Sequence, residues 1–487
     1  MNQDGFLKKR KFTDIICAII FLAYIVLMFY MAIYGWSNGD LDKVAQPIDS
    51  SKNECGKGDF SDFRYLYINL NSDGISLNLK ETVCVDICPR ETDDVISCKP
   101  NNEVKNCNDL KVYPTYGFLG RLCVPTAENL FNKLKGNIDL DYATEAIEEI
   151  QIAWPNYIIA FFLTVFIACV FYLLMRCFAF VIVWALVLGT LVALVVGGVV
   201  CFKKYQTLND QGNDDSANKY KAAAICLWVA SGIYLLLMLC LCSQINLALK
   251  LIKASCTFIA TTPTIVFVPL IHTAIAALWT VFWLYGFLYI YSVGETDAQS
   301  STIFKKILWD DKTKAFVGLF ILGGLWLISF TISTNIFTIA AMAATWYFSA
   351  ADDGIGMFRG MCWAYSYHLG SLAFGSFIIA LIWFIQLILN YIYSKLKDKN
   401  SSVKFLMKCI MCFVACFERL MKFVNKHAYI EVLLRNKTFC GGVFKAVALL
   451  TGNFLRVGIL MGLVSLVMFI NTVFVVFLVC LICFYSI

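Results

Sequence analysis

Charged side chains are scarce in this 487-residue chain: Asp, Glu, Lys and Arg make up 15% of it, against roughly 25% in an ordinary soluble domain. Apolar residues make up 60%, and the mean hydropathy is +0.71. A chain of this length cannot hide so much apolar surface inside one or two soluble cores. The composition therefore excludes a soluble enzyme, a disordered protein and a small disulfide scaffold, and it predicts a protein that crosses a membrane several times.

Catalytic and metal-binding patterns are also absent from the sequence. None of its three histidines, His272, His368 and His427, lies in an HExxH motif or beside a GxSxG motif, and there is no Walker loop for ATP. The pair Cys84 and Cys88 has no histidine nearby to complete a zinc site. We therefore expect no enzymatic activity, no cofactor and no metal.

The few charges are unevenly distributed. Residues 37–150 hold 20 acidic and 12 basic side chains, whereas the rest of the chain has a net charge of +14. Four basic residues at positions 8–11 precede the first apolar run. Because Lys and Arg collect on the cytoplasmic side of membrane helices, the N-terminus is predicted inside and the acidic segment outside. This topology and anionic lipid account for the basic surplus, so no nucleic-acid partner is implied.

Six of the 21 cysteines lie in the acidic segment, at Cys55, Cys84, Cys88, Cys98, Cys107 and Cys123. An even number in an extracytoplasmic segment indicates three disulfides, whose pairing the sequence leaves open.

Nine apolar runs are long enough to cross the bilayer as helices. They cover residues 14–35, 152–175, 178–202, 222–242, 257–292, 315–348, 368–394, 405–425 and 459–485. We therefore expect an all-α integral membrane protein of about nine transmembrane helices, with a disulfide-bonded extracellular loop between the first two.

The expected parts of the chain follow from these spans. They are a cytoplasmic N-terminus (1–13), a first span (14–35), an extracellular cysteine-containing loop (36–151), a core of spans two to seven (152–394), a region with the eighth span (405–425) and basic amphipathic connections (395–458), and a ninth span (459–485). Only Arg176 and Cys177 separate spans two and three, which predicts a tight hairpin. Nine spans put the glycosylation sequon at Asn400 outside and the one at Asn436 inside.

Aromatic side chains are concentrated in two spans that contain no Asp, Glu, Lys or Arg, 257–292 and 315–348. They include Trp279, Trp283, Tyr285, Trp326, Trp346 and Tyr347. Asn335 lies between Trp326 and the pair Trp346 and Tyr347. An uncharged cavity walled by aromatic rings suits a permanent cation, which cannot donate hydrogen bonds. The alternative is that these residues anchor helices at the membrane surface, and Trp346 and Tyr347 near a span end fit that interpretation best.

Two further features point to helix packing or gating. Pro263 and Pro269 indicate either a broken helix that lines a cavity or a short helix that leads into a tilted span. Ser371 and Gly375 are four residues apart, which allows close helix packing. His368, at a span end, is a candidate for a gating or proton-linked group.

The run from His368 to Ser376, HLGSLAFGS, is the most specific motif of the chain. Together with other residues it resembles the choline transporter-like family. The other matching positions are Trp326, Asn335, Ala340, Trp346, Tyr347, Cys416, Phe417, Glu418, Asn425, Ala428, Tyr429, Ile430, Phe439 and Cys440, and weaker ones surround the six cysteines of the acidic segment.

This resemblance implies a ten-span carrier with both termini inside and a disulfide-bonded first extracellular loop. It also implies facilitated movement of choline, with ethanolamine as a second candidate, to supply phospholipid synthesis. Two departures from the family pattern stand out. Gln386 and Asn390 replace an Arg and a Glu of the seventh span, and the chain stops at Ile487 after the ninth predicted span.

The leading hypothesis is therefore a carrier of choline or another small quaternary or primary amine, in the plasma membrane, with an organelle membrane as the alternative location. Trp279, Trp283 and Trp326 would enclose the ammonium, and Asn335 would accept a hydrogen bond from the choline hydroxyl. Rearrangement around Pro263 and Pro269 would alternate access. The second hypothesis is a non-transporting, structural or receptor-like membrane protein that acts through its disulfide-bonded loop.

Overall fold

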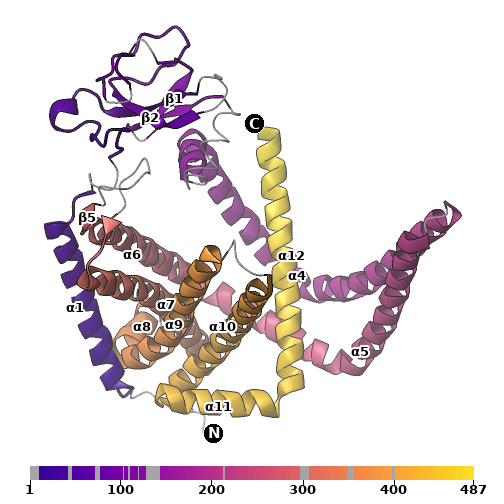
Figure 1. The fold of residues 1–487 in the computed structure, drawn as a ribbon. Coiled ribbons are helices and arrows are strands. Elements are labelled where there is room, and N and C mark those ends of the chain that lie inside the picture. The colour runs from indigo at the N-terminus through magenta and orange to yellow at the C-terminus, as the bar shows by residue number, and fades with distance from the viewer. Residues whose placement is uncertain are drawn as a thin grey trace.

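The computed structural model describes residues 10–41, 46–71, 77–101, 104–107, 110–118, 120–127, 143–211, 214–296, 307–348, 356–396 and 401–486. It shows a bundle of long helices with a small sheet domain at one end (Figure 1). The predicted class, a helical membrane protein with a disulfide-bonded loop after the first span, is confirmed.

The loop after helix α1 (Ile15–Asn38) folds into a four-stranded sheet. Its elements are the short helix η1 (Gly58–Phe60) and the strands β1 (Tyr65–Leu70), β2 (Leu77–Val85), β3 (Thr115–Phe118) and β4 (Leu122–Pro125). The strand order is β2-β1-β4-β3, with β1 antiparallel to β2 and parallel to β4. No strands were predicted here from the sequence, because β3 and β4 have only four residues each and a long connection separates them from β2, which leaves little periodicity to detect.

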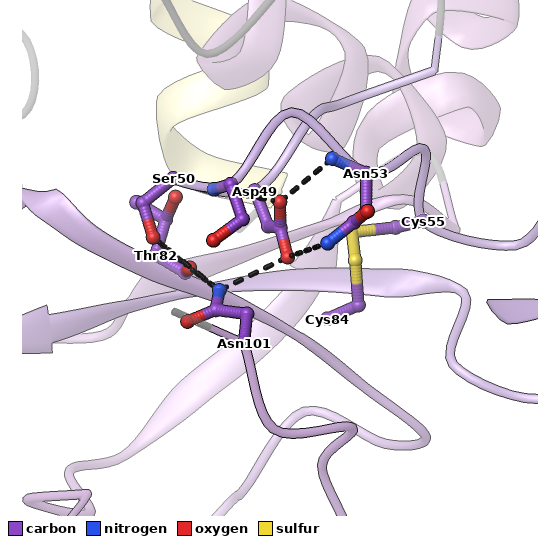
Figure 2. Close-up of a disulfide and its surroundings, with 8 residues drawn as sticks. Asp49, Ser50, Asn53, Cys55, Thr82, Cys84 and Asn101 are labelled. Atoms are coloured by element: carbon purple, nitrogen blue, oxygen red, sulfur yellow. Dashed lines mark hydrogen bonds between the residues drawn. A yellow bond between two sulfur atoms is a disulfide. The ribbon is translucent and has the colours of Figure 1, made fainter. Parts of the chain in front are cut away.

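Three disulfides cross-link the sheet domain, as predicted, and the structure settles their pairing as Cys55–Cys84, Cys88–Cys123 and Cys98–Cys107. Figure 2 shows the first of these beside the buried carboxylate of Asp49. Asn53 and Asn101 each donate a side-chain hydrogen bond of 3.0 Å to this carboxylate. Such bonds offset the cost of burying a charged group.

The remaining elements form the membrane part. The long helices are α4 (Ala143–Asp210), α5 (Asp214–Thr261), α6 (Phe267–Ser292), α7 (Asp311–Phe348), α9 (Leu369–Lys395), α10 (Ser401–Arg435), α11 (Phe439–Gly452) and α12 (Phe454–Ser486). Shorter pieces are η3 (Pro263–Val266), β5 (Glu295–Thr296), β6 (Ile307–Leu308), α8 (Met357–Cys362) and the π-turn η4 (Trp363–Tyr367). In Figure 1, the end of α4 and the start of α5, where the two helices meet, project away from the other helices, and α11 lies across the end opposite to the sheet domain.

Six helices among the described residues are long and apolar enough to cross a membrane. A seventh span results if α11 and the start of α12, which meet at 90°, are counted as one. The predicted number of nine therefore stays a prediction. Helix α10 covers the predicted span 405–425 and continues to Arg435, and the predicted span 459–485 lies within α12.

The predicted hairpin between spans two and three is wrong. The backbone is helical without interruption from Ala143 to Asp210, through Arg176 and Cys177. Neither residue is a Gly or a Pro, so nothing in this dipeptide breaks the helical hydrogen bonds. The turn between neighbouring antiparallel helices follows Asp210 instead, before α5 begins.

The largest buried cluster among the described residues lies between α1, α7, α9, α10 and α11. It joins large side chains of all five helices, namely Phe21, Trp326, Phe330, Phe337, Leu372, Tyr429, Leu433 and Phe439. Gly375 allows α9 to approach this cluster closely, because a Cβ atom there would collide with the rings of Tyr429 and Phe439. The packing role predicted for Gly375 agrees with this close approach.

Candidate functional site

The predicted aromatic residues lie in three separate clusters. Trp279 and Trp283 pack with Met28 and Phe320, and the Nε1 group of Trp283 donates to the Phe320 carbonyl at 2.9 Å. Since an indole N–H that is bonded to a helix carbonyl anchors its ring, Trp283 is held against α7.

Trp326 is buried in the five-helix cluster with 4% of its surface exposed. Its Nε1 group donates to the Ala373 carbonyl at 3.0 Å, and the rings of Phe21, Tyr24 and Phe377 surround it at centroid distances of 4.8–5.1 Å. Trp326 thus ties α7 to α9.

The other predicted contacts are more peripheral. Trp346 packs on Phe258 at 5.3 Å. Tyr285 is 50% and Tyr347 71% exposed, which fits the alternative role as membrane-surface anchors. Asn335 lies on α7, and its Oδ1 atom is buried and has no hydrogen-bond donor among the described residues. The structure therefore does not bring the predicted set together around one cavity.

A cavity of about 290 Å³ lies between α7, α9 and α10. This is close to the lower limit of about 300 Å³ for small-molecule sites. Its lining residues are Ser329, Ile332, Ser333, Ile336, Ile379, Trp383, Lys422, Asn425, Lys426 and Tyr429. It combines two aromatic rings, three isoleucines and several polar groups.

The polar groups of the cavity are partly unpaired. Tyr429 and Ser333 share a hydrogen bond of 3.0 Å. Asn425 is 3% exposed, and its Nδ2 group donates to the Gly375 carbonyl at 2.8 Å. The Oδ1 atom of Asn425 is buried without a donor among the described residues. Asn425 therefore brings an unpaired acceptor to the side of the cavity that it lines, at the cost that an unsatisfied buried acceptor carries.

A carboxylate stands at the edge of this cavity. Glu418 on α10 accepts hydrogen bonds from the indole of Trp383 at 2.8 Å and from the amide of Gln386 at 2.7 Å, and it forms an ion pair with Lys422. Gln386, at a position where the family resemblance leads us to expect an arginine, thus serves as a donor to an acid. Asn390 is exposed one turn further along α9.

This cavity was not predicted from the sequence, although two of its lining residues, Asn425 and Tyr429, are among the positions that resemble the family. Glu418, Lys422, Asn425 and Tyr429 are spaced by four, three and four residues, so they share one face of α10. That spacing was a detectable signal. The signal was not recognised because α10 contains many other basic residues, which are typical of a helix face exposed to solvent.

Two of the predicted packing or gating residues, His368 and Ser371, lie beside the chain that leads into α1. Residues Arg10–Asp14, here called the N-terminal strap, cross the start of α9. The carboxylate of Asp14 accepts hydrogen bonds from the Ser371 hydroxyl at 2.5 Å and from the Phe439 backbone N–H at 2.7 Å. Thr13 lies 3.1 Å from Nδ1 of the fully buried His368.

The strap is also held at its first residue. The guanidinium of Arg10 lies over the Trp363 ring, 4.3 Å from its centroid, and donates to the Leu433 carbonyl. Burial lowers the pKa of Arg10 to about 10, so it stays charged at neutral pH. The amide of Asn436, oriented to satisfy both partners, pairs with the backbone of Lys11. The strap therefore joins α9, α10 and α11 at the end of the bundle opposite to the sheet domain.

The two prolines mark a boundary between helices. Pro263 opens η3, and Pro269 is the third residue of α6. Both positions tolerate proline, because the first N–H groups of a helix have no partner within it. Of the two interpretations of this segment, a helix that leads into a span, rather than one broken at mid-span, agrees with these positions.

Comparison with known proteins extends these observations. The family model described as plasma-membrane choline transporter matches residues 225–487, which include the cavity and the partners of the strap. The chain is 25% identical to choline transporter-like protein 2 of Dictyostelium discoideum, over 96% of this chain and 83% of that protein. It is also 25% identical to choline transporter-like protein 4 of Xenopus laevis and of Homo sapiens, over 96% of this chain and 82% and 81% of those proteins.

Proposed function

The chain belongs to the plasma-membrane choline transporter family, and we propose on that basis that it carries choline or a closely related organic cation across the membrane. A multi-pass membrane protein of this family is expected to act as a transporter. The finer proposal, the substrate and its binding site, rests on the cavity between α7, α9 and α10.

The observation that carries this proposal is the combination of two aromatic rings and one free acceptor in a small cavity. The trimethylammonium group of choline cannot donate hydrogen bonds, so it binds best to ring faces, at about 0.5–2 kcal/mol for each contact. Trp383 and Tyr429 supply the rings. The choline hydroxyl is a donor, and Asn425 Oδ1 would accept its hydrogen bond.

Access would alternate through release of the N-terminal strap. While Asp14 holds Ser371 and Phe439, α9 and α11 are tied together at that end of the bundle. Charge-assisted hydrogen bonds of this kind contribute about 1.5–3 kcal/mol each. A conformational cycle could break them at moderate cost. Rotation at the break between α5 and α6, around Pro263 and Pro269, would move α6 in the same cycle.

The test is uptake of radiolabelled choline by proteoliposomes that contain the full chain. We expect saturable uptake, and we expect Trp383→Leu to reduce uptake at low choline concentration by about 3- to 30-fold, the equivalent of one cation–π contact. Trp326→Leu and Trp279→Leu test the rival proposal that these rings enclose the cation. A loss confined to those two variants, with Trp383→Leu unaffected, would move the site to them.

Absence of saturable uptake by the wild type would contradict the transport proposal. Together with capture of a protein partner by the sheet domain, it would support the non-transporting alternative.

A further inference from the structure

One face of the Trp383 ring already carries a cation. The Nζ atom of Lys422 lies 5.0 Å from the ring centroid, within the distance of about 6 Å at which a cation and an aromatic ring attract each other. The same ammonium is 2.5 Å from Oε1 of Glu418, the oxygen to which the indole of Trp383 also donates. The ring, the ammonium and the carboxylate thus each contact the other two. Trp383 and Lys422 both line the cavity.

This ammonium belongs to the more exposed partner of the ion pair. The Lys422 side chain is 50% exposed, whereas that of Glu418 is 17% exposed. A lysine carries its charge on a flexible four-carbon stem and can leave one partner without any backbone change. Glu418, in contrast, keeps its hydrogen bonds from Trp383 and Gln386 when Lys422 leaves. The ring and the acid are therefore the fixed part of the set, and the lysine is its movable part.

We propose that Lys422 is a built-in competitor of the substrate: its ammonium occupies the Trp383 face in the empty cavity, and the substrate ammonium displaces it. This inference rests on the proposed function and identifies the cation subsite as Trp383 with Glu418 as its counter-ion. The ligand class is a small monocationic ammonium, and the hydroxyl of such a ligand would bond to Asn425 Oδ1.

The arrangement has an electrostatic consequence. Without Lys422, an empty cavity would leave Glu418 uncompensated beside a ring face, which attracts any small cation. With Lys422 in place, a ligand must displace the lysine. It can do so only if its contacts with the ring and the cavity wall contribute more binding free energy than the lysine loses when it leaves. A hydrated metal ion makes no apolar contact with Ile332, Ile336 or Ile379, so Lys422 favours an organic cation over an inorganic one.

The experiment compares choline KM and maximal rate for variants of the full chain in proteoliposomes. Lys422→Met removes the competitor, and we expect KM to fall by about 2- to 10-fold. Lys422→Arg strengthens it, because a guanidinium stacks better on an indole, and we expect KM to rise. Lys408→Met is the matched control, since Lys408 lies on the same helix and is not among the lining residues; its KM should equal that of the wild type.

Opposite shifts of KM in the Met and Arg variants would support the proposal, because a merely structural lysine would give losses in both. Wild-type choline uptake together with an unchanged or raised KM in Lys422→Met would overturn the inference alone. Should Lys422→Met fail to fold, Lys422→Arg decides: a KM at or below the wild-type value overturns the inference. Absence of choline uptake by the wild type would overturn the proposed function and, with it, this inference.

Discussion

The carboxylate of Asp14 accepts a hydrogen bond of 2.5 Å from the Ser371 hydroxyl, although the two residues are 357 positions apart. Asp14 lies just before α1 with φ near 50°, a left-handed conformation that non-glycine residues adopt rarely. Its neighbour in space, Gly370, has no room for a Cβ atom, which would collide with the Asp14 backbone. The first four residues of the most specific motif, HLGS, therefore hold the N-terminal strap.

Loss of the Asp14 charge should loosen this end of the bundle. In Asp14→Asn, the bonds from Ser371 and from the Phe439 N–H are no longer charge-assisted, a loss of about 1–2 kcal/mol. We expect faster hydrogen–deuterium exchange at residues 437–442 and 369–373. Asp310→Asn is the control. At the start of α7, the Thr313 backbone N–H donates to the Asp310 carboxylate, so this variant weakens a helix cap elsewhere and should leave exchange in both segments unchanged. Equal exchange in Asp14→Asn and the wild type would contradict the role of the Asp14 carboxylate in holding α9 and α11 together.

Gly375 tests the close approach of α9 and α10. In Gly375→Ala, the added methyl group must displace Tyr429 or Phe439, both fully or nearly fully buried, and we expect a destabilisation of about 1–3 kcal/mol. Thermal unfolding of the detergent-solubilised protein measures this. Gly318→Ala is the matched control, because a Cβ atom there meets nothing within 4 Å. A melting temperature of Gly375→Ala equal to that of Gly318→Ala would contradict the packing described.

Asn425 should decide the preference for a hydroxyl group. In Asn425→Leu the free acceptor of the cavity is lost, so preference for choline over ethyltrimethylammonium should fall by about 5-fold, the equivalent of one hydrogen bond of about 1 kcal/mol. Competition between the two compounds for uptake measures this ratio. Asn335→Leu is the comparison, because the sequence alone predicted Asn335 as the acceptor. A loss of preference in Asn335→Leu only would reverse the assignment.

The two sequons give a direct test of topology. The amide of Asn436 pairs with the Lys11 backbone in the strap, so it is not available for a glycan. Asn400 lies outside the described residues. We expect the shift in mobility on glycosidase treatment to disappear in Asn400→Gln and to persist in Asn436→Gln. The converse pattern would overturn the predicted topology.

Much of the membrane architecture follows from local sequence. Apolar runs longer than 18 residues have few alternatives to a membrane helix, so spans such as 14–35 and 368–394 agree closely with α1 and α9. The hairpin at Arg176 was predicted wrongly because span length, rather than a helix-breaking residue, suggested it. The sheet of the disulfide-bonded domain went unassigned, since its strands are short and its order joins β1 to the distant β4.

The candidate site was harder to predict. Trp279, Trp283 and Trp326 are deep and aromatic, as a cation site requires, yet helix carbonyls hold two of the three indole groups. Whether an indole faces a cavity or a carbonyl depends on the rotation of each helix against its neighbours. The spacing of four, three and four residues between Glu418, Lys422, Asn425 and Tyr429 indicated that they share one face of a helix. It did not indicate which helices pack against that face.

By itself, the sequence determined the membrane class, the resemblance to the choline transporter-like family and the presence of three disulfides, because hydropathy, motif spacing and cysteine number are properties of the chain alone. Only the tertiary structure decided the disulfide pairing, the strap from Arg10 to Asp14 and the cavity that Trp383 shares with Asn425. The residues that they join lie between 9 and several hundred positions apart. The contacts of the strap and the cavity depend on helix rotation and on the close approach that small residues such as Gly370 and Gly375 allow.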